Sequence, residues 1–312
     1  MLAWELVGAV IGAGLASGRE IASFFARYGA WGFLGILAAV AVMTALSDTF
    51  IPLRWQGRWP AALWKTLLSL LLIATGGAML SGAGEIAALT LPFQGAYWLG
   101  MGVTLLLAWL LAQRTLHGLA WVSRGLLAVL TVLIFLGFML PPMQAVPVSE
   151  MHPSAAILRA VTYGGFNAAI QVPIVLQAAE MSQREKKRAI RTAGLLILLV
   201  LMLGNAVLLR HSALLGEAMP FVRMLSSLGK AGYTLGAVSL YLSILSTLTA
   251  CLRGLSGRCW CLAAIVSAAL FGFSGVVDTL YPLLGGGCLV MLAAAKLTNC
   301  YSRPFHSQRD MI

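Results

Sequence analysis

Glycines and charged residues near the N-terminus are spaced so that they could bind a small polar solute inside a membrane. Four glycines fall within eleven residues and two charges follow them directly, namely Gly8, Gly12, Gly14, Gly18, Arg19 and Glu20. Each glycine weakens a helix by roughly 1 kcal/mol relative to alanine, so this stretch predicts a helix interrupted from Ile11 to Ala16. The alternative is close helix packing, because both glycine pairs have the small-xxx-small spacing.

A second apolar stretch carries a similar set of helix-weakening residues at its middle. Gly164 and Gly165 are followed by Asn167 and Pro173, which predicts a second interruption over residues 163–167. An interruption in a helix leaves N–H and carbonyl groups without their helical hydrogen bonds. The N–H groups attract a carboxylate, and the carbonyl groups suit a cation. The substrate-binding residues predicted from the two breaks are Gly12, Ala13, Gly14, Leu15, Tyr163, Gly164, Gly165, Phe166 and Asn167.

Three charged residues lie inside apolar stretches, where a charge costs about 2.5–3.5 kcal/mol on insertion scales. They are Arg19, Glu20 and Glu85, and we expect them to act in gating or coupling. One interpretation is an Arg19–Glu85 ion pair that neutralises both charges and holds or gates the helices. The other is that Glu20 or Glu85 binds the ammonium group of a solute or a transported proton.

The elements that would position these residues are membrane-spanning helices. Of the 312 residues, 60% are hydrophobic and only 10% are charged, whereas a soluble domain carries about a quarter charged residues. This composition excludes a soluble enzyme, a disordered chain and a nucleic-acid-binding domain. Ten apolar runs come near the roughly 20 residues that a spanning helix needs, at 2–27, 30–51, 62–90, 96–112, 117–140, 154–179, 192–210, 232–252, 260–275 and 276–298.

The basic residues indicate a multi-pass protein of the plasma membrane with both termini in the cytoplasm. With this orientation 15 of the 21 lysines and arginines lie on the cytoplasmic side and four lie outside, as the positive-inside rule requires. A predicted cytoplasmic loop at 184–191 holds five of them. The cytoplasmic set is Arg54, Arg58, Lys65, Arg114, Arg124, Arg184, Lys186, Lys187, Arg188, Arg191, Arg253, Arg258, Lys296, Arg303 and Arg309; the outer set is Arg27, Arg210, Arg223 and Lys230.

Ten helices divide into two halves of five that have opposite orientations in the membrane. Residues 1–141 would form the first five-helix repeat, and residues 142–312 the second repeat with a short cytoplasmic tail, all within one membrane domain. The two interrupted helices then hold the same position in each half, which is the best sequence indication of a transporter binding site. The long connection at 211–231 contains Pro220, and we expect it to form a lid with a short helix over the outer face.

The first apolar run carries a recognisable motif. Residues 8–15, Gly-Ala-Val-Ile-Gly-Ala-Gly-Leu, resemble the first-helix signature G-x-x-I-G-x-G-I/L of the amino acid–polyamine–organocation (APC) transporter superfamily. Residues 12–21, with Phe24-Phe25 and Tyr28-Gly29, are similar to the YkvI-like membrane proteins of that superfamily. The resemblance implies the all-α LeuT-type fold, a 5+5 inverted repeat with helices 1 and 6 interrupted and solute bound between helices 1, 3, 6 and 8.

The resemblance also implies a sodium site between two carbonyls of the first helix and hydroxyl groups of the eighth. The matching carbonyls are those of Gly8 and Ile11, and the matching hydroxyls are those of Ser246 and Thr247. Proton-driven relatives place a lysine in helix 5, which has none here, and this favours sodium over a proton. The alternative is helix packing by small residues that share one helical face, namely Ser239, Ser243, Ser246 and Ala250.

These observations predict a secondary active transporter, a cation-coupled symporter of a small amino-acid-like solute that works by alternating access. The alternative is a membrane-embedded receptor subunit of the same fold, which senses a solute without net transport. We do not expect an enzyme, because the sequence has no intramembrane His/Asp cluster and no G-x-S-x-G motif. We expect no cofactor or metal beyond a bound Na⁺, and the expected partners are the solute and the lipid bilayer, without nucleic acid.

Overall fold

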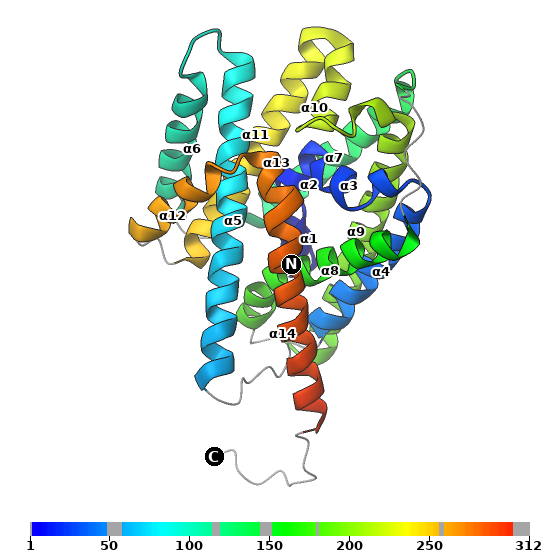
Figure 1. The fold of residues 1–312 in the computed structure, drawn as a ribbon, viewed down its shortest axis with the longest axis vertical. Helices are drawn as coiled ribbons and strands as arrows, with labels where there is room; N and C mark the ends of the chain where they lie inside the picture. The colour runs from blue at the N-terminus through cyan, green and yellow to red at the C-terminus, as the bar shows by residue number, and fades with distance from the viewer. Residues whose placement is uncertain are drawn as a thin grey trace.

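The computed structural model describes residues 2–48, 58–113, 119–143, 152–178, 181–255 and 259–301, and these residues form helices and no strand. Figure 1 shows the helices gathered into one bundle. The longer helices are α4 (Trp31–Ser47), α5 (Arg58–Thr90), α6 (Ala96–Ala112), α7 (Leu119–Met139), α8 (Pro153–Gln177), α9 (Gln183–Arg210), α11 (Gly229–Gly254), α12 (Cys259–Ala269) and α14 (Tyr281–Tyr301). The shorter elements are α1 (Leu2–Val10), α2 (Ala13–Ser17), α3 (Arg19–Phe24), η1 (Ala26–Tyr28), η4 (Ser212–Leu214), α10 (Pro220–Leu225), η5 (Ser226–Leu228), α13 (Phe273–Gly275) and η6 (Val276–Leu280).

In the described residues, each of the ten apolar runs predicted from the sequence falls mainly on helices. The run at 96–112 matches α6 residue for residue, and the run at 154–179 matches α8 within two residues at each end. The first run is divided among α1, α2 and α3, and the last between η6 and α14. Among the basic residues assigned to the cytoplasm, five lie outside the described residues: Arg54, Arg114, Arg258, Arg303 and Arg309.

Several helices have the length and composition of membrane spans. Within the described ranges, 4 helical stretches are long and apolar enough to cross a membrane, namely Pro60–Thr90, Gln183–Arg210, Pro220–Gly254 and Phe273–Lys296. Trp98 and Leu106 of α6 are among many large apolar side chains that are exposed on the bundle surface, where hydrocarbon would cover them. The chain is therefore a membrane protein, while its orientation and its division into inverted halves at residue 141 stay predictions.

The basic segment at 184–191 is helical rather than a loop, which corrects the prediction. α9 begins at Gln183, nine residues before the predicted start at 192. The Glu185 N–H donates to Ser182 Oγ at 3.3 Å, and the Ser182 N–H donates to Glu185 Oε2 at 2.9 Å. This capping box satisfies the first N–H groups of a helix, so the helix can begin before the apolar run does.

The glycines of α8 serve close packing, and α8 is helical throughout. It packs against α4 on one side and α14 on the other. A Cβ atom on Gly164 would lie 2.6 Å from the carbonyl oxygen of Ala39, and one on Gly165 would lie 2.7 Å from the Cβ atom of Leu289. The interruption predicted at 163–167 is therefore wrong, because the missing side chains let two neighbouring helices approach rather than breaking this one.

The ninth predicted helix is shorter than expected. α12 ends at Ala269, and Gly272 has a φ of 73°, which L-residues with a side chain rarely adopt. The boundary predicted at 275–276 therefore falls earlier, at 270–272. The chain then passes through α13 into the π-helix η6, which contains Asp278 and leads into α14.

The connection at 211–231 contains the short helix that the sequence predicts. The helix is α10, and η4 and η5 flank it. Phe221 of α10 is fully buried, and its ring lies 3.2 Å from the position that a Cβ atom on Gly18 would take. The lid segment, residues 211–231, therefore packs onto the junction between α2 and α3.

Candidate solute-binding site

The first helix is interrupted, over fewer residues than predicted. α1 ends at Val10 and the short turn α2 begins at Ala13. Between them the Gly12 N–H donates to the Val10 carbonyl at 2.8 Å, so the helical bond from Gly12 to the carbonyl of Gly8 is lost. The non-helical stretch is Ile11–Gly12, because the residues from Ala13 onward form α2 instead of extending the break to Ala16.

The start of α2 leaves backbone donors free beside the break. Among the described groups, none accepts a hydrogen bond from the N–H of Gly14 or of Leu15. The chain changes direction again at Gly18, whose φ is 83°. Two changes of direction within seven residues separate α1 from α3, and they place unpaired backbone in the middle of the bundle.

α11 presents two hydroxyl groups to this break. Ser243 Oγ donates to the Ile11 carbonyl at 3.5 Å, and Thr247 Oγ1 lies 3.4 Å from the position that a Cβ atom on Gly12 would take. The two side chains are four residues apart and share one face of α11. Of the predicted ion ligands, Ile11 and Thr247 therefore lie at the break, while Ser243 rather than Ser246 is the serine that contacts it. Their binding of an ion stays a prediction.

Glu20 lies beside α2 and is buried, with 4% of its surface exposed. Its carboxylate fills the space next to Gly14, where a Cβ atom would overlap it. The Tyr163 hydroxyl donates to Glu20 Oε2 at 3.2 Å. Sequence reasoning placed the carboxylate of a solute in front of Gly14, and the structure places a carboxylate of the protein there. A cationic group therefore suits this position better than an anion.

Aromatic rings from three elements line the region around Glu20. Tyr163 of α8 packs against Phe24 of α3 with 5.0 Å between ring centroids. Phe166 of α8 stacks on Tyr281 of α14 at 4.3 Å. The Asn167 amide donates to the carbonyl of Tyr163 at 3.0 Å, so in this structure it bonds within α8. Of the predicted solute-binding residues in α8, Tyr163 and Phe166 thus lie on the side of Glu20 and the break. Gly164 and Gly165 face other helices.

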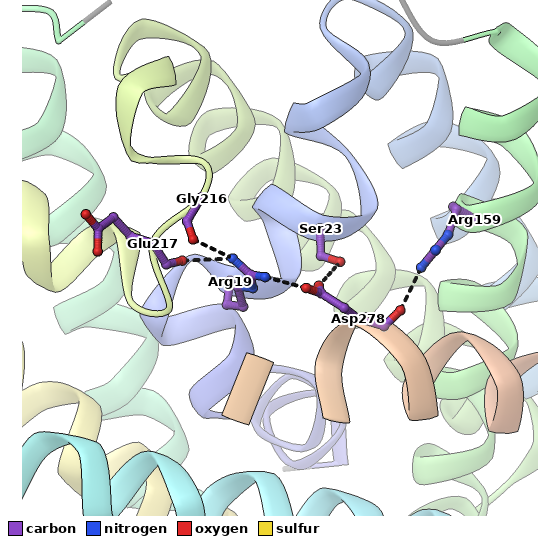
Figure 2. Close-up of polar contacts among 6 residues, drawn as sticks. All are labelled: Arg19, Ser23, Arg159, Gly216, Glu217 and Asp278. Atoms are coloured by element: carbon purple, nitrogen blue, oxygen red, sulfur yellow. Dashed lines mark hydrogen bonds and ion pairs between the residues drawn. The ribbon is translucent and has the colours of Figure 1, made fainter. Parts of the chain in front are cut away.

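Arg19 connects three separate parts of the chain (Figure 2). Its guanidinium forms an ion pair with Asp278 of η6. Its Nη1 donates to the carbonyl of Gly216 at 3.3 Å and to that of Glu217 at 2.9 Å. Arg19 is 6% exposed, and the Asp278 side chain is 29% exposed. The arginine therefore ties α3 and the lid segment to η6, on one side of the break.

Two further residues hold Asp278 in place. Ser23 Oγ donates to Asp278 Oδ1 at 2.5 Å, and Arg159 Nη1 donates to the Asp278 carbonyl at 3.0 Å. Asp278 lies in the π-helix, and π-helical turns are frequent at functional sites. Its side chain and its main chain are thus both fixed from outside its own helix.

The predicted Arg19–Glu85 ion pair is wrong. Glu85 lies near the backbone of Phe273, at the start of α13, and is within the influence of the Arg19 charge without forming an ion pair with it. Arg19 pairs with Asp278, which sequence reasoning missed as a partner. A signal was available, because Asp278 is the only acidic residue between positions 260 and 298, and an isolated charge in an apolar run predicts a buried partner.

Comparison with solved structures identifies the class of fold. The chain has the fold of a membrane transporter: a manganese transporter from Eremococcus coleocola, in complex with an aromatic bis-isothiourea substituted compound, matches with a TM-score of 0.57 at 15% identity. The match covers 94% of this chain and 76% of that one. A mutant of the same transporter matches with a TM-score of 0.58 at 16% identity over the same shares.

Comparison with other protein sequences gives a more particular relative. The chain is 22% identical to the uncharacterized membrane protein YkvI of Bacillus subtilis (strain 168), over an alignment of 331 positions that covers 94% of each protein. No family model matches the sequence. The likeness to YkvI agrees with the resemblance found in the first helix, and it covers nearly the whole chain.

Proposed function

We propose that this protein is a secondary active transporter that carries a small amino-acid-like solute together with a cation. The observation that carries the proposal is the interruption of the first helix inside the bundle, next to polar side chains of three other elements. Unpaired backbone at membrane depth is tolerated only where it lines a cavity or is buried in protein. The Gly14 and Leu15 N–H groups, the Thr247 hydroxyl and the Glu20 carboxylate would offer a solute donors and acceptors of both signs.

The oxygen atoms near Ile11 and Thr247 suit a sodium ion. The Ile11 carbonyl and the hydroxyls of Ser243 and Thr247 gather at the break, and these neutral oxygen donors match a hard monovalent cation. A positive ion there would stand close to the C-terminus of α1, whose carbonyls carry partial negative charge. We therefore favour sodium as the coupling ion at this position.

The network around Arg19 would close one side of the site during transport. It joins α3 to the lid segment and to η6, and alternating access requires that contacts of this kind form and break as the site opens. By the charge distribution this is the outer side. In this proposal Arg19 and Asp278 close the site, and the break in the first helix binds the solute and the cation.

The proposed solute differs from the metal carried by the structural neighbours. In the described part of the chain, no group of three His, Cys, Asp or Glu side chains is placed to hold a metal ion. Glu20 is accompanied at the break by hydroxyl groups and aromatic rings instead. This donor set suits an organic cation or zwitterion, and it is the reason that we propose an amino-acid-like solute.

Uptake into proteoliposomes tests the proposal. Purified protein would be reconstituted and supplied with radiolabelled amino acids and small amines, with and without an inward sodium gradient. We expect gradient-dependent accumulation of at least one compound, and we expect Thr247→Ala to weaken the sodium dependence more than the solute affinity at saturating sodium. Thr234→Ala, at an exposed position on the same helix, is the matched control. Binding without accumulation would instead support a solute-sensing receptor.

A further inference from the structure

Glu20 is a buried carboxylate without a positive partner. In the described ranges the one ion pair is that between Arg19 and Asp278, and it engages the arginine next to Glu20 in the chain. The one hydrogen bond that a described residue gives to Glu20 comes from the Tyr163 hydroxyl, at 3.2 Å. Glu20 thus lies in the interior with a single neutral donor.

No positive group on the elements packed against α3 forms an ion pair with Glu20 in the described ranges. The Asp278 carboxylate is already paired with Arg19 and Ser23, and Arg159 is bonded to the Asp278 carbonyl. Neither α2 nor residues 200–208 of α9, which meet α3 near Gly204, carry a titratable side chain. The titratable groups on the remaining neighbours are Arg27 and Tyr28 of η1, Arg159 and Tyr163 of α8, Asp278 of η6, and Tyr281, which follows η6.

A charged carboxylate in such a place is far less stable than a neutral one, because burial removes water and nothing replaces its charge compensation. The aromatic rings of Phe24, Tyr163 and Tyr281 add little compensation for an anion, whereas their faces attract a cation. The surroundings of Glu20 therefore favour one added positive charge. A proton supplies it when no solute is bound.

We propose that Glu20 holds a proton in this buried arrangement and exchanges it for the ammonium group of the solute. The inference rests on the proposed function, and it names the residue that binds the solute's charged group. In the exchange the O–H bond of the carboxylic acid breaks and the proton passes to water on the open side. The carboxylate then forms an ion pair with the R–NH₃⁺ group, so one proton leaves for each ammonium bound and no electron moves.

For a solute whose only charge is the ammonium group, the exchange keeps the site neutral, because an uncharged acid in the empty protein is replaced by an ion pair in the loaded one. For a zwitterion, the added carboxylate of the solute is balanced by the sodium ion proposed at the break. Tyr163 can donate its hydroxyl hydrogen to Glu20 in both states. Gly14 has a role in the same exchange, because only a residue without a side chain leaves room for the carboxyl group.

Infrared difference spectroscopy of the purified protein tests directly whether Glu20 holds a proton. We expect a carbonyl stretch of a protonated carboxylic acid near neutral pH, absent in Glu20→Gln and retained in Glu217→Gln, whose side chain is exposed. Tyr163→Phe should shift the frequency of this band, because it removes the hydrogen bond to the carboxyl group. Glutamine matches the neutral acid in shape, so Glu20→Gln should fold, and its melting temperature in detergent verifies this.

Two sets of compounds test whether a bound ammonium group displaces the proton of Glu20. Amino-acid amides keep the ammonium group and lose the carboxylate, whereas N-acetyl amino acids keep the carboxylate and lose the charge on nitrogen. We expect at least one amide to abolish the acid band and to release one proton per bound molecule in weakly buffered solution, and no N-acetyl compound to do so. Glu20→Gln should release none.

The absence of the acid band, or an acid band that no amine removes, would overturn the inference. Both measurements use detergent-solubilised protein and need no transport. Failure of uptake in proteoliposomes with an intact band and proton release would contradict the proposed transport alone. Uptake of a solute without an acid band on Glu20 would contradict this inference alone.

Discussion

Two glycine-rich stretches of this protein look alike in the sequence and differ in the fold. Around Gly12 the chain leaves helical geometry, whereas around Gly164 and Gly165 α8 continues without a break. The neighbours explain the difference. At Gly164 a side chain would meet the backbone of α4, and at Gly165 that of α14. At Gly12 and Gly14 it would meet Thr247 and Glu20, which are polar side chains.

The comparison indicates when glycine breaks a membrane helix. A glycine lowers the stability of a helix by a similar amount in both places. An interruption persists only if other groups can satisfy or bury the freed backbone, as Ser243 does for the Ile11 carbonyl. Where the neighbours are close-packed backbones, the continuous helix is the stable alternative.

The largest effect should come from filling the close contact in α8. Gly165→Val would place a branched side chain against Leu289 and the carbonyl of Gly285, at 2.7 and 2.8 Å for the Cβ atom alone. We expect a loss of about 3 kcal/mol or more, at the upper end for overpacking, measured by unfolding in mixed micelles. Gly102→Ala, where nothing lies within 4 Å, is the control and should be neutral or stabilising. Equal stability of the two variants would contradict the close-packing role of Gly165.

Removing the arginine beyond the first break should have the next largest effect. Arg19→Ala leaves Asp278 without its partner and the carbonyls of Gly216 and Glu217 without a donor. We expect about 3 kcal/mol, the lower end for a broken buried pair, because Asp278 is 29% exposed. Arg223→Ala, on the exposed face of α10, should change stability little. A wild-type melting temperature in Arg19→Ala would mean that the lid segment is held in another way.

A double-mutant cycle at the break tests whether Glu20 is the reason for glycine at position 14. Gly14→Ala forces the Glu20 carboxylate to move, which should cost about 1–3 kcal/mol. In a Glu20→Ala background the same change should cost much less, because the space is then empty. Additive effects in the cycle would show that the two residues do not share this space.

The smallest expected effect concerns the hydroxyl group that meets the break. Ser243→Ala removes the hydrogen bond to the Ile11 carbonyl, which at 3.5 Å is long. We expect about 0.5 kcal/mol, the low end for such bonds, and a larger change in sodium dependence than in stability. Thr234→Ala serves again as the control on the same helix. A loss of several kcal/mol would mean that the freed carbonyl depends on Ser243 alone.

Hydropathy predicted the helices well because membrane helices must be long and apolar. The placement of α6 and the break after Val10 follow from local sequence, and so does the short helix α10. The partners of Arg19 and the packing of Gly164 do not, because they depend on which helices become neighbours. The start of α9 could have been predicted from Ser182 and Glu185, whose spacing matches a capping box.

The shortness of α12 has a consequence for the surrounding lipid. Its eleven residues span about 16 Å at 1.5 Å per residue, against a hydrocarbon thickness of roughly 30 Å. Leu270 and Phe271, each 67% exposed, follow it directly, and acyl chains would cover them. As the ninth span of the predicted ten-helix arrangement, α12 would thin the bilayer beside it, at a cost of fractions of a kcal/mol per Å. We therefore expect short acyl chains to match the bilayer to α12 locally, whereas the longer α5 and α9 suit a bilayer of ordinary thickness.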